Sequence, residues 1–151
     1  MYGKLWLVLA TLGLGACAGT PPAHLGVKDG RLAPCPASPN CVSSQAPASD
    51  VQHAIAALEL RRADLPWPQI VDVVGSLPRT RIVKQEEGYL HAESRSAWLG
   101  FVDDVELYRP ANSQWLALRS ASRLGYSDLG VNRARMQALR ESMAKAGLLA
   151  D

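Results

Sequence analysis

Residues 81–121 hold the pattern that most constrains the fold, because apolar and polar side chains alternate there with a period of two. The alternation falls into four segments, at residues 81–85, 89–96, 102–108 and 114–121, and turn residues lie at 86–88 and 110–113. Two antiparallel hairpins, and together a four-stranded meander, are therefore predicted. In the last segment we expect Leu116 and Leu118 to face a core, and Trp115, Ala117 and Arg119 to face a partly polar side.

Two segments with helical spacing flank this meander. Residues 67–76 carry a broad apolar face, with Pro68 in the first turn and Pro78 beyond the end. Residues 131–146 carry an apolar stripe that precedes a natural C-terminal cap at Gly147. The stripe consists of Met136, Leu139, Met143 and Ala146, which we interpret as core residues. Residues 53–62 fit neither period, and we interpret them as extended, with helix as the alternative. The predicted fold class is α+β, an antiparallel sheet of about four strands packed against two helices.

The first 17 residues are typical of a bacterial lipoprotein signal peptide. Lys4 precedes an apolar run at residues 5–16, which is shorter than the roughly 20 residues that a membrane-spanning helix needs. The run ends in LGAC at residues 14–17, so we expect cleavage after residue 16 and acylation of Cys17. The residue after the cysteine is Ala18 and not aspartate, which by analogy favours an outer-membrane anchor facing the periplasm. The alternatives are ordinary signal cleavage that leaves a free Cys17, and a buried helix.

After the signal peptide, residues 17–31 are rich in glycine and proline and are predicted to form a lipidated tether. Residues 32–151 are predicted to form a single globular domain. Loss of Lys4 with the signal peptide lowers the formal net charge from +2 to +1, with both signs spread along the chain. Nucleic acid is therefore not an expected partner. The chain has no P-loop, dinucleotide-binding or metalloprotease motif, and we expect no cofactor.

Cys35 and Cys41 remain as a pair in the processed chain. An even number of cysteines in an exported protein favours a disulfide, here one that closes a short loop and contributes roughly 2 kcal/mol. A metal site is the alternative, but its further ligands would have to come from the scattered His24, His53 and His91. We therefore expect a disulfide and no metal.

Three stretches together resemble the bacterial and plastid family called domain of unknown function 1499. The stretches are CP at 35–36 with SPNCVSSQ at 38–45, FVDDVE at 101–106, and RSASR at 119–123 with GYSDLGVNR at 125–133. The resemblance covers residues 32–147. It implies a protein associated with the cell envelope, often anchored by lipid or tethered to the membrane. It implies no catalytic residues, because no activity is established for the family.

Polar residues cluster in the last two of these stretches. Asp103 and Asp104 are adjacent on a predicted strand, so their side chains point to opposite faces and one of them faces inward. An inward carboxylate is costly unless it is paired, and Arg119, Arg123 and Arg133 offer bidentate partners. Asp128 or Asn132 is suited to cap the final helix. The candidate cluster consists of Asp103, Asp104, Arg119, Ser122, Arg123, Asp128, Asn132 and Arg133.

Two interpretations of this cluster compete. In the first, ion pairs and caps lock the C-terminal helix onto the sheet. In the second, the arginines and Ser120, Ser122 and Ser127 form a pocket for an anionic group such as a carboxylate or a lipid phosphate. With the anchor, these features predict a non-catalytic module that binds an anionic or lipidic envelope component, or a protein partner, at the membrane.

Two other functions remain open. A hydrolase would use His91 as its base, or a carboxylate pair made by Glu93 with Asp103 or Asp104. No G-x-S-x-G context surrounds any serine, and arginine pairing would lower the pKa values that such a carboxylate pair needs raised. A purely structural envelope lipoprotein without a ligand is the second alternative.

Overall fold

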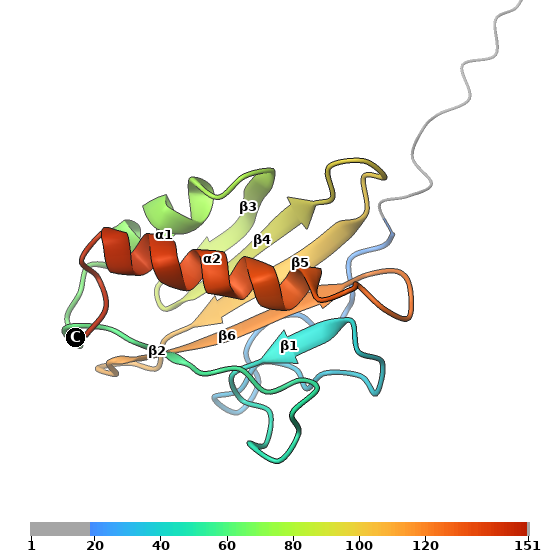
Figure 1. Cartoon of the computed structure of the whole chain (residues 1–151). Helices are drawn as coiled ribbons and strands as arrows, with labels where there is room; N and C mark the ends of the chain where they lie inside the picture. The colour runs from blue at the N-terminus through green and yellow to red at the C-terminus, as the bar shows by residue number, and fades with distance from the viewer. Residues whose placement is uncertain (1–18, 151) are drawn as a thin grey trace, which may run out of the picture.

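Within residues 19–150, which the computed structural model describes, six strands form one antiparallel sheet. The strands are β1 (Cys41–Ser43), β2 (Leu58–Glu59), β3 (Thr80–Glu86), β4 (Tyr89–Arg95), β5 (Val102–Tyr108) and β6 (Trp115–Ser122). Neighbouring strands follow the order β1-β6-β5-β4-β3, and β2 pairs with the start of β6. Figure 1 shows that α1 (Trp67–Gly75) and α2 (Val131–Lys145) cover the same face of this sheet.

The predicted α+β class and the meander are confirmed, because β3, β4, β5 and β6 pair in chain order. The predicted count of about four strands is too low, since β1 and β2 both pair with the outer edge of β6. These two strands have three and two residues, too few to show a period of two. Residues 53–62, interpreted as extended, contain only β2 and single bridges at Ala54 and Leu60.

The face of the sheet beneath the helices is the apolar core. Alternate residues of the central strands point to it, and Leu116 and Leu118 do so as predicted. The core includes Leu90, Ala92, Val105 and Leu107 of the sheet with Trp67, Ile70, Val74, Met136, Leu139 and Met143 of the helices. A fully buried side chain of this size contributes about 1.5–3 kcal/mol. This burial holds α1 in place, although its valines and isoleucine are weak helix formers.

Asp128 fixes the beginning of α2. Its carboxylate accepts hydrogen bonds from the backbone N–H groups of Gly130 and Asn132, at 3.0 and 2.7 Å. The N-cap residue itself is Gly130, so neither predicted residue occupies that position; Asp128, two residues before it, accepts the hydrogen bonds, and the Asn132 side chain turns inward and is fully buried.

Gly147 ends α2, as predicted, with a positive φ of 66°. Its N–H donates to the Ala144 carbonyl, and the Leu148 N–H donates to the Met143 carbonyl, a pair of bonds typical of a glycine-terminated helix. The turn brings Leu148 into the core and leaves Ala146 exposed. Ala146, predicted as the fourth residue of the buried stripe, is thus not a core residue.

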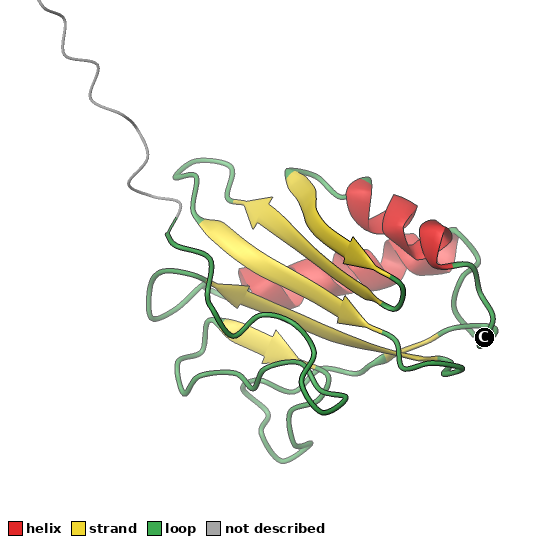
Figure 2. Cartoon of the chain, turned by 180° about the vertical axis from the view of Figure 1, so that it is seen from behind, coloured by secondary structure: helices red, strands yellow, loops and turns green. Residues whose placement is uncertain are grey.

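The other face of the sheet carries no helix, and we call it the helix-free face. Figure 2 shows that the chain before β1 runs across this face. The N–H of Gly26 donates to the Glu106 carboxylate at 2.8 Å, and Leu32 is buried with Tyr89 and Ala117. The segment predicted as a tether therefore contacts the sheet over part of its length.

Candidate functional site

Strand alternation gathers ionisable side chains on the helix-free face. The residues of β4, β5 and β6 that do not face the core point there together, and most of them are buried. They include Tyr89, His91, Glu93, Asp104, Glu106 and Arg119, and Arg123 follows directly after β6. The side of the sheet predicted to be partly polar is thus a buried and charged layer.

Arg123 lies at the centre of one ion-pair network. Its Nε and Nη2 donate to the two carboxylate oxygens of Asp104 at 2.9 and 2.7 Å, the bidentate contact expected of this pair. Its Nη2 also donates to Glu93 at 2.7 Å, and His91 Nε2 lies 2.7 Å from Asp104 Oδ1. The Arg123 side chain is 3% exposed and that of Asp104 is 2% exposed, so the network is desolvated.

The protonation of this network follows from its contacts. Burial disfavours the charged forms of Asp104 and Glu93, but the hydrogen bonds that they accept outweigh it, and the pKa of each carboxyl lies below its ordinary value. The hydrogen bonds to Asp104 raise the pKa of Arg123 above its ordinary value, although burial opposes this shift. The carboxylates are therefore ionised at neutral pH.

A second network surrounds Glu106, which is fully buried. Its carboxylate accepts hydrogen bonds from Tyr89 Oη at 2.8 Å, Arg119 Nη1 at 3.2 Å and the backbone N–H of Gly26. Burial and the neighbouring Glu106 carboxylate raise the pKa of the Tyr89 hydroxyl, which stays protonated and donates. This network fastens the N-terminal segment to β5.

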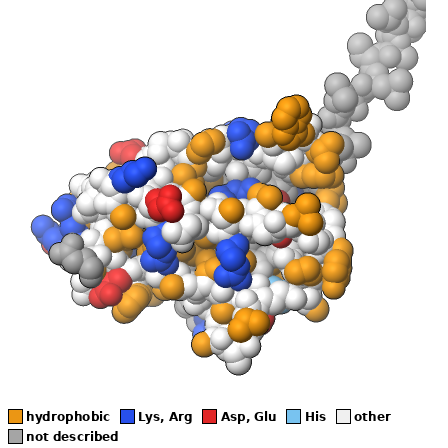
Figure 3. Space-filling model, viewed as in Figure 1, with side chains coloured by type: hydrophobic (Ala, Val, Ile, Leu, Met, Phe, Trp, Pro, Cys, Tyr) orange, Lys and Arg blue, Asp and Glu red, His pale blue; other side chains and the backbone are white. Residues whose placement is uncertain are grey.

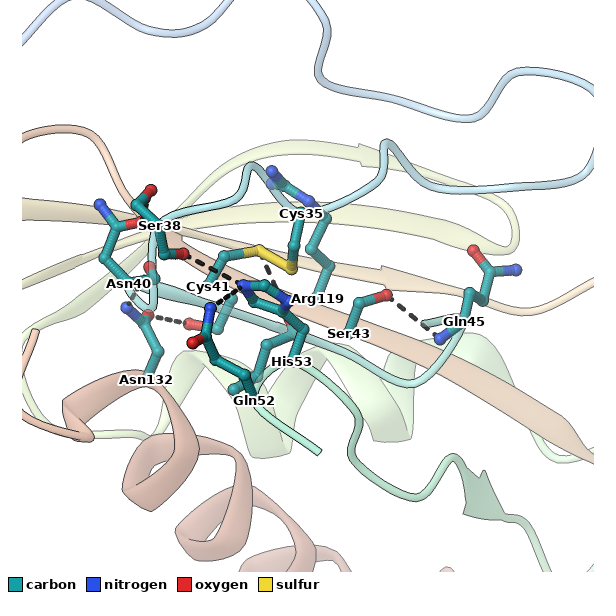
Figure 4. The surroundings of a disulfide bond; sticks show 12 residues. Cys35, Ser38, Asn40, Cys41, Ser43, Gln45, Gln52, His53, Arg119 and Asn132 are labelled. Carbon is teal, nitrogen blue, oxygen red and sulfur yellow. Dashed lines mark hydrogen bonds between the residues drawn. A yellow bond between two sulfur atoms is a disulfide. The ribbon is translucent and has the colours of Figure 1, made fainter. Parts of the chain in front are cut away.

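The Cys35–Cys41 disulfide shapes the same region. It joins the N-terminal segment to β1, and the expected pairing is present in the structure. Figure 4 shows the Arg119 side chain beside this disulfide, and Ser43 of β1 pairs directly with Arg119 across the strands. We call residues 19–36 the covering segment, and the disulfide holds the end of this segment over the end of β6.

A cavity of about 440 Å³ lies between the covering segment and the sheet. Residues 33–36 with Pro22 and His24 form one side of it, and Asp104, Arg119 and Arg123 with residues 121–122 form the other. We call this the site cavity. A second hollow of about 880 Å³ adjoins it and shares His24 and residues 33–35 with it. The second hollow is lined by apolar residues such as Leu25 and Leu32 and also by the charged Lys28, Asp29, Arg31 and Asp50.

Arg119 has unused donor capacity at the wall of the site cavity. The residue is 2% exposed, and among the described residues its Nε has no hydrogen-bond partner. A buried donor without a partner costs about 1–3 kcal/mol, and more when the group is charged. The nitrogen has almost no solvent-accessible surface, so a small shift of the side chain would have to bring it to an acceptor in the cavity, and an anion would be the best acceptor.

The sheet separates the other residues of the predicted cluster from this cavity. Asp103 points to the helix side and accepts a hydrogen bond from Arg135 Nη2 at 2.6 Å. Asn132 lies on the same side, where its Nδ2 donates to the Ser122 hydroxyl at 2.9 Å and to the Asn40 carbonyl at 3.1 Å.

Arg133 lies away from both groups and donates to the carbonyls of residues 51, 52 and 54. The predicted single cluster is therefore divided. Asp104, Arg119 and Arg123 come together at the site cavity, with Ser122 at its edge. Asp103 and Asn132 connect α2 to the sheet, Asp128 bonds to the first turn of α2, and Arg133 connects α2 to the loop before β2.

Three side chains that take part in these buried contacts were not among the predicted site residues: Glu106, Tyr89 and Arg135. The signal for Glu106 was present, because it follows Asp104 by two residues on one strand and must share its face. Tyr89 stands in the same relation to His91 and Glu93 on β4. Arg135 gave no such signal, since its pairing with Asp103 depends on how α2 crosses the sheet.

Two further predictions concern metals and membranes. Cys17 and the signal peptide lie outside the described residues. Within residues 19–150, no helix is long and apolar enough to cross a membrane. In the same part of the chain, no three histidine, cysteine or acidic side chains lie close enough together to hold a metal ion.

The fold and the cavity define an α+β domain whose polar sheet face is closed by its own N-terminal segment. The family described as "Protein of unknown function (DUF1499)" matches residues 31–143, most of the chain. The chain therefore belongs to the DUF1499 family, and the predicted resemblance is confirmed. No curated protein and no solved structure matches it.

Proposed function

We propose that this protein is an envelope lipoprotein, anchored through Cys17 in the outer membrane and facing the periplasm, that binds an anionic group in the site cavity without catalysis. The observation that supports this function best is the unpartnered Nε of buried Arg119 at the cavity wall. Arg123 is bonded to Asp104 and Glu93, and Arg119 Nη1 is bonded to Glu106, so the donor that remains for an incoming anion among the described residues of these networks is Arg119 Nε.

The proposed anchor is close to the cavity in the covalent chain. Cys17 precedes Gly19 by two residues, a span of at most about 7 Å when extended. A Cβ atom at Gly19 would lie 3.1 Å from Arg123 Cβ, so the described chain begins directly beside the cavity wall. A ligand from the surface of the anchoring membrane would therefore need to travel only a short distance. The hollow next to the cavity offers Leu25, Val27 and Leu32 as apolar contacts for the hydrophobic part of an anionic lipid, beside the charged residues that also line it.

Calorimetric titration of the purified mature protein tests the proposal with two probes, inorganic phosphate and short-chain phosphatidylglycerol. Binding of both indicates a site for phosphate itself, and binding of the lipid alone indicates a headgroup site. In Arg119→Gln, affinity should fall by about 10–100-fold, because hydrogen bonds to charged groups are worth about 1.5–3 kcal/mol. Arg62→Gln is the matched control, since Arg62 pairs only with Asp64 on the surface. An Arg119→Gln protein that binds both probes as tightly as the wild type would contradict the proposal.

One contact favours the hydrolase alternative, namely the 2.7 Å contact of His91 Nε2 with Asp104, which resembles the base and orienting acid of a triad. The lowered pKa values of Glu93 and Asp104 oppose their use as general acids. Turnover of ester, glycoside or phosphate substrates that is abolished by both His91→Ala and Asp104→Asn would establish the hydrolase. A protein without turnover and without saturable binding would support the structural alternative.

A further inference from the structure

Two adjacent loops carry most of the exposed large apolar side chains. The β4–β5 loop, residues 96–101, exposes Trp98, Leu99 and Phe101, by 96, 64 and 40%. The loop from the end of β6 to α2, residues 124–130, exposes Leu124, Tyr126 and Leu129, by 44, 75 and 94%. We call these six side chains the apolar rim. Among the described residues, the remaining exposed large apolar side chains are Val27, Val51, Val83, Trp115 and Val131.

The two loops lie side by side at one end of the sheet. Arg95 pairs with Val102 across β4 and β5, and the N–H of Arg123 donates to the Val102 carbonyl at 3.1 Å. Both loops therefore extend from the same end of the sheet, as Figure 1 shows. Figure 3 shows hydrophobic side chains gathered at this end of the molecule.

The described chain begins at the same end. A Cβ atom at Gly19 would lie 3.1 Å from Arg123 Cβ and 3.3 Å from Leu124 Cγ, so the first described residue contacts the start of the second loop. Because Cys17 is only two residues earlier, its acyl chains would enter a bilayer within about 7 Å of Gly19. The apolar rim would then face the surface into which the anchor inserts.

The charge and chemistry of the rim fit a bilayer. Residues 96–101 contain no charged side chain. Asp128 is the single charged residue at positions 124–130, and its carboxylate accepts hydrogen bonds from the N–H groups of Gly130 and Asn132. Tryptophan and tyrosine are enriched at membrane interfaces, where an apolar ring and a polar tip meet lipid and water.

Leu129 shows that the rim is costly in water. It combines 94% exposure with a positive φ of 54°, a conformation that leucine rarely adopts. Neither feature benefits a domain that is surrounded only by water.

We propose that the apolar rim docks into the interface of the membrane that carries the anchor, so that the helix-free face and the site cavity are held beside the lipid headgroups. This inference depends on the anchored part of the proposed function and is independent of any ligand in the cavity. A bilayer is the partner that fits the apolar rim, because the proposed anchor leaves the domain at this end of the sheet.

The test uses the acylated mature protein in phosphatidylcholine vesicles with brominated acyl chains, which quench nearby tryptophans. Trp98 lies in the rim, whereas Trp115 is 54% exposed at the other end of β6, about 27 Å from Arg123. Trp115→Phe should keep strong quenching, and Trp98→Phe should lose most of it. Buried Trp67 remains in both variants as a common background.

Leu129→Asn is a second variant, chosen because it should remove an apolar side chain from the rim without destabilising the fold. Asparagine tolerates a positive φ, so this protein should melt at or above the wild-type temperature. It should nevertheless show weaker quenching of Trp98.

Three results would overturn the inference. The first is equal quenching of Trp98 and Trp115 in protein whose acylation is verified by intact mass. The second is protection of Trp98 without lipid quenching together with a cross-linked dimer, which would make a second copy the occupant. The third is mature protein without acyl chains, which would overturn the proposed anchor as well. Phosphate and lipid titrations of the cavity report on the ligand proposal separately.

Discussion

Replacement of Arg123 by alanine removes the cation at the centre of the buried network on the helix-free face. Asp104 and Glu93 then stay buried without their shortest contacts to an arginine. Removal of one partner from a buried ion pair typically costs about 3–5 kcal/mol. Because Glu93 keeps Arg81 at 3.1 Å and Asp104 keeps His91 at 2.7 Å, we expect the lower end of this range, about 3 kcal/mol. For a domain of this size, that loss lowers Tm by about 10 °C.

The loss should depend on pH in a defined direction. In the wild type, the lowered pKa values of Asp104 and Glu93 stabilise the fold above the unfolded values of about 4, and this stabilisation disappears as pH falls through the folded values. Without Arg123, burial dominates and raises the pKa of Asp104, so the folded variant gains from protonation. The difference between the two proteins should be full at pH 7, should begin to shrink as pH falls through the raised pKa of Asp104 in the variant, and should shrink further below about pH 4.

Urea and thermal unfolding followed by circular dichroism, at neutral and acidic pH, measure both effects. The matched control is Arg62→Ala, since Arg62 and Asp64 form a pair whose side chains are 63 and 71% exposed. Loss of such an exposed pair should change the stability very little. The reasoning is refuted if Arg123→Ala melts like this control at pH 7, or if its deficit is the same at neutral and acidic pH.

Three further perturbations have defined outcomes. Cys35 and Cys41 should resist thiol labelling without reductant, and reduction should lower the unfolding free energy by roughly 2 kcal/mol; stoichiometric labelling would contradict this. The hydrogen bond to Asp50 is the chief cause of the raised pKa of His53, so in Asp50→Asn this pKa should fall toward about 6.5 in an NMR titration. The wild-type protein loses the stabilisation from His53 as pH rises through the folded pKa, and this pH-dependent stabilisation should be smaller in the variant. An unchanged pKa of His53 would exclude the hydrogen bond as the cause. Gly88→Ala should destabilise the fold by more than Gly147→Ala, because both positions have positive φ but only at Gly88 would the new Cβ meet a backbone oxygen, that of Arg109 at 2.8 Å; equal losses in urea unfolding would contradict this.

Local patterns were sufficient to predict the central strands and both helices. The predicted segment 102–108 coincides with β5, the segment for β4 differs by one residue at one end, and those for β3 and β6 differ by one residue at both ends. These segments are long enough for their periodicity to be unambiguous. β1 and β2 were beyond reach of this reasoning, because they exist only where they pair with β6.

The candidate site was predictable only in part, for a geometric reason. Strand alternation correctly separates Asp103 from Asp104, but it does not say which arginine each carboxylate meets. Arg123 reaches Asp104 from the end of β6, and Arg135 reaches Asp103 from α2. The position of the N-terminal segment over the cavity could not be predicted, because residues 19–34 have no periodic apolar pattern. This segment is held by contacts such as the hydrogen bond from Gly26 to Glu106.

The two faces of the sheet differ in what they contribute to folding. The helix-covered face buries leucine, valine and methionine, which stabilises the domain directly. Buried ion pairs on the helix-free face offer no comparable advantage, because well-packed apolar residues in their place are often equally stable or more so. Stability alone therefore does not explain why Glu106 and Arg119 are both nearly inaccessible to solvent, or why one Arg119 donor is left unpaired. The proposed anion-binding role would account for the unpaired donor, since a desolvated guanidinium binds an incoming anion more strongly than one in water.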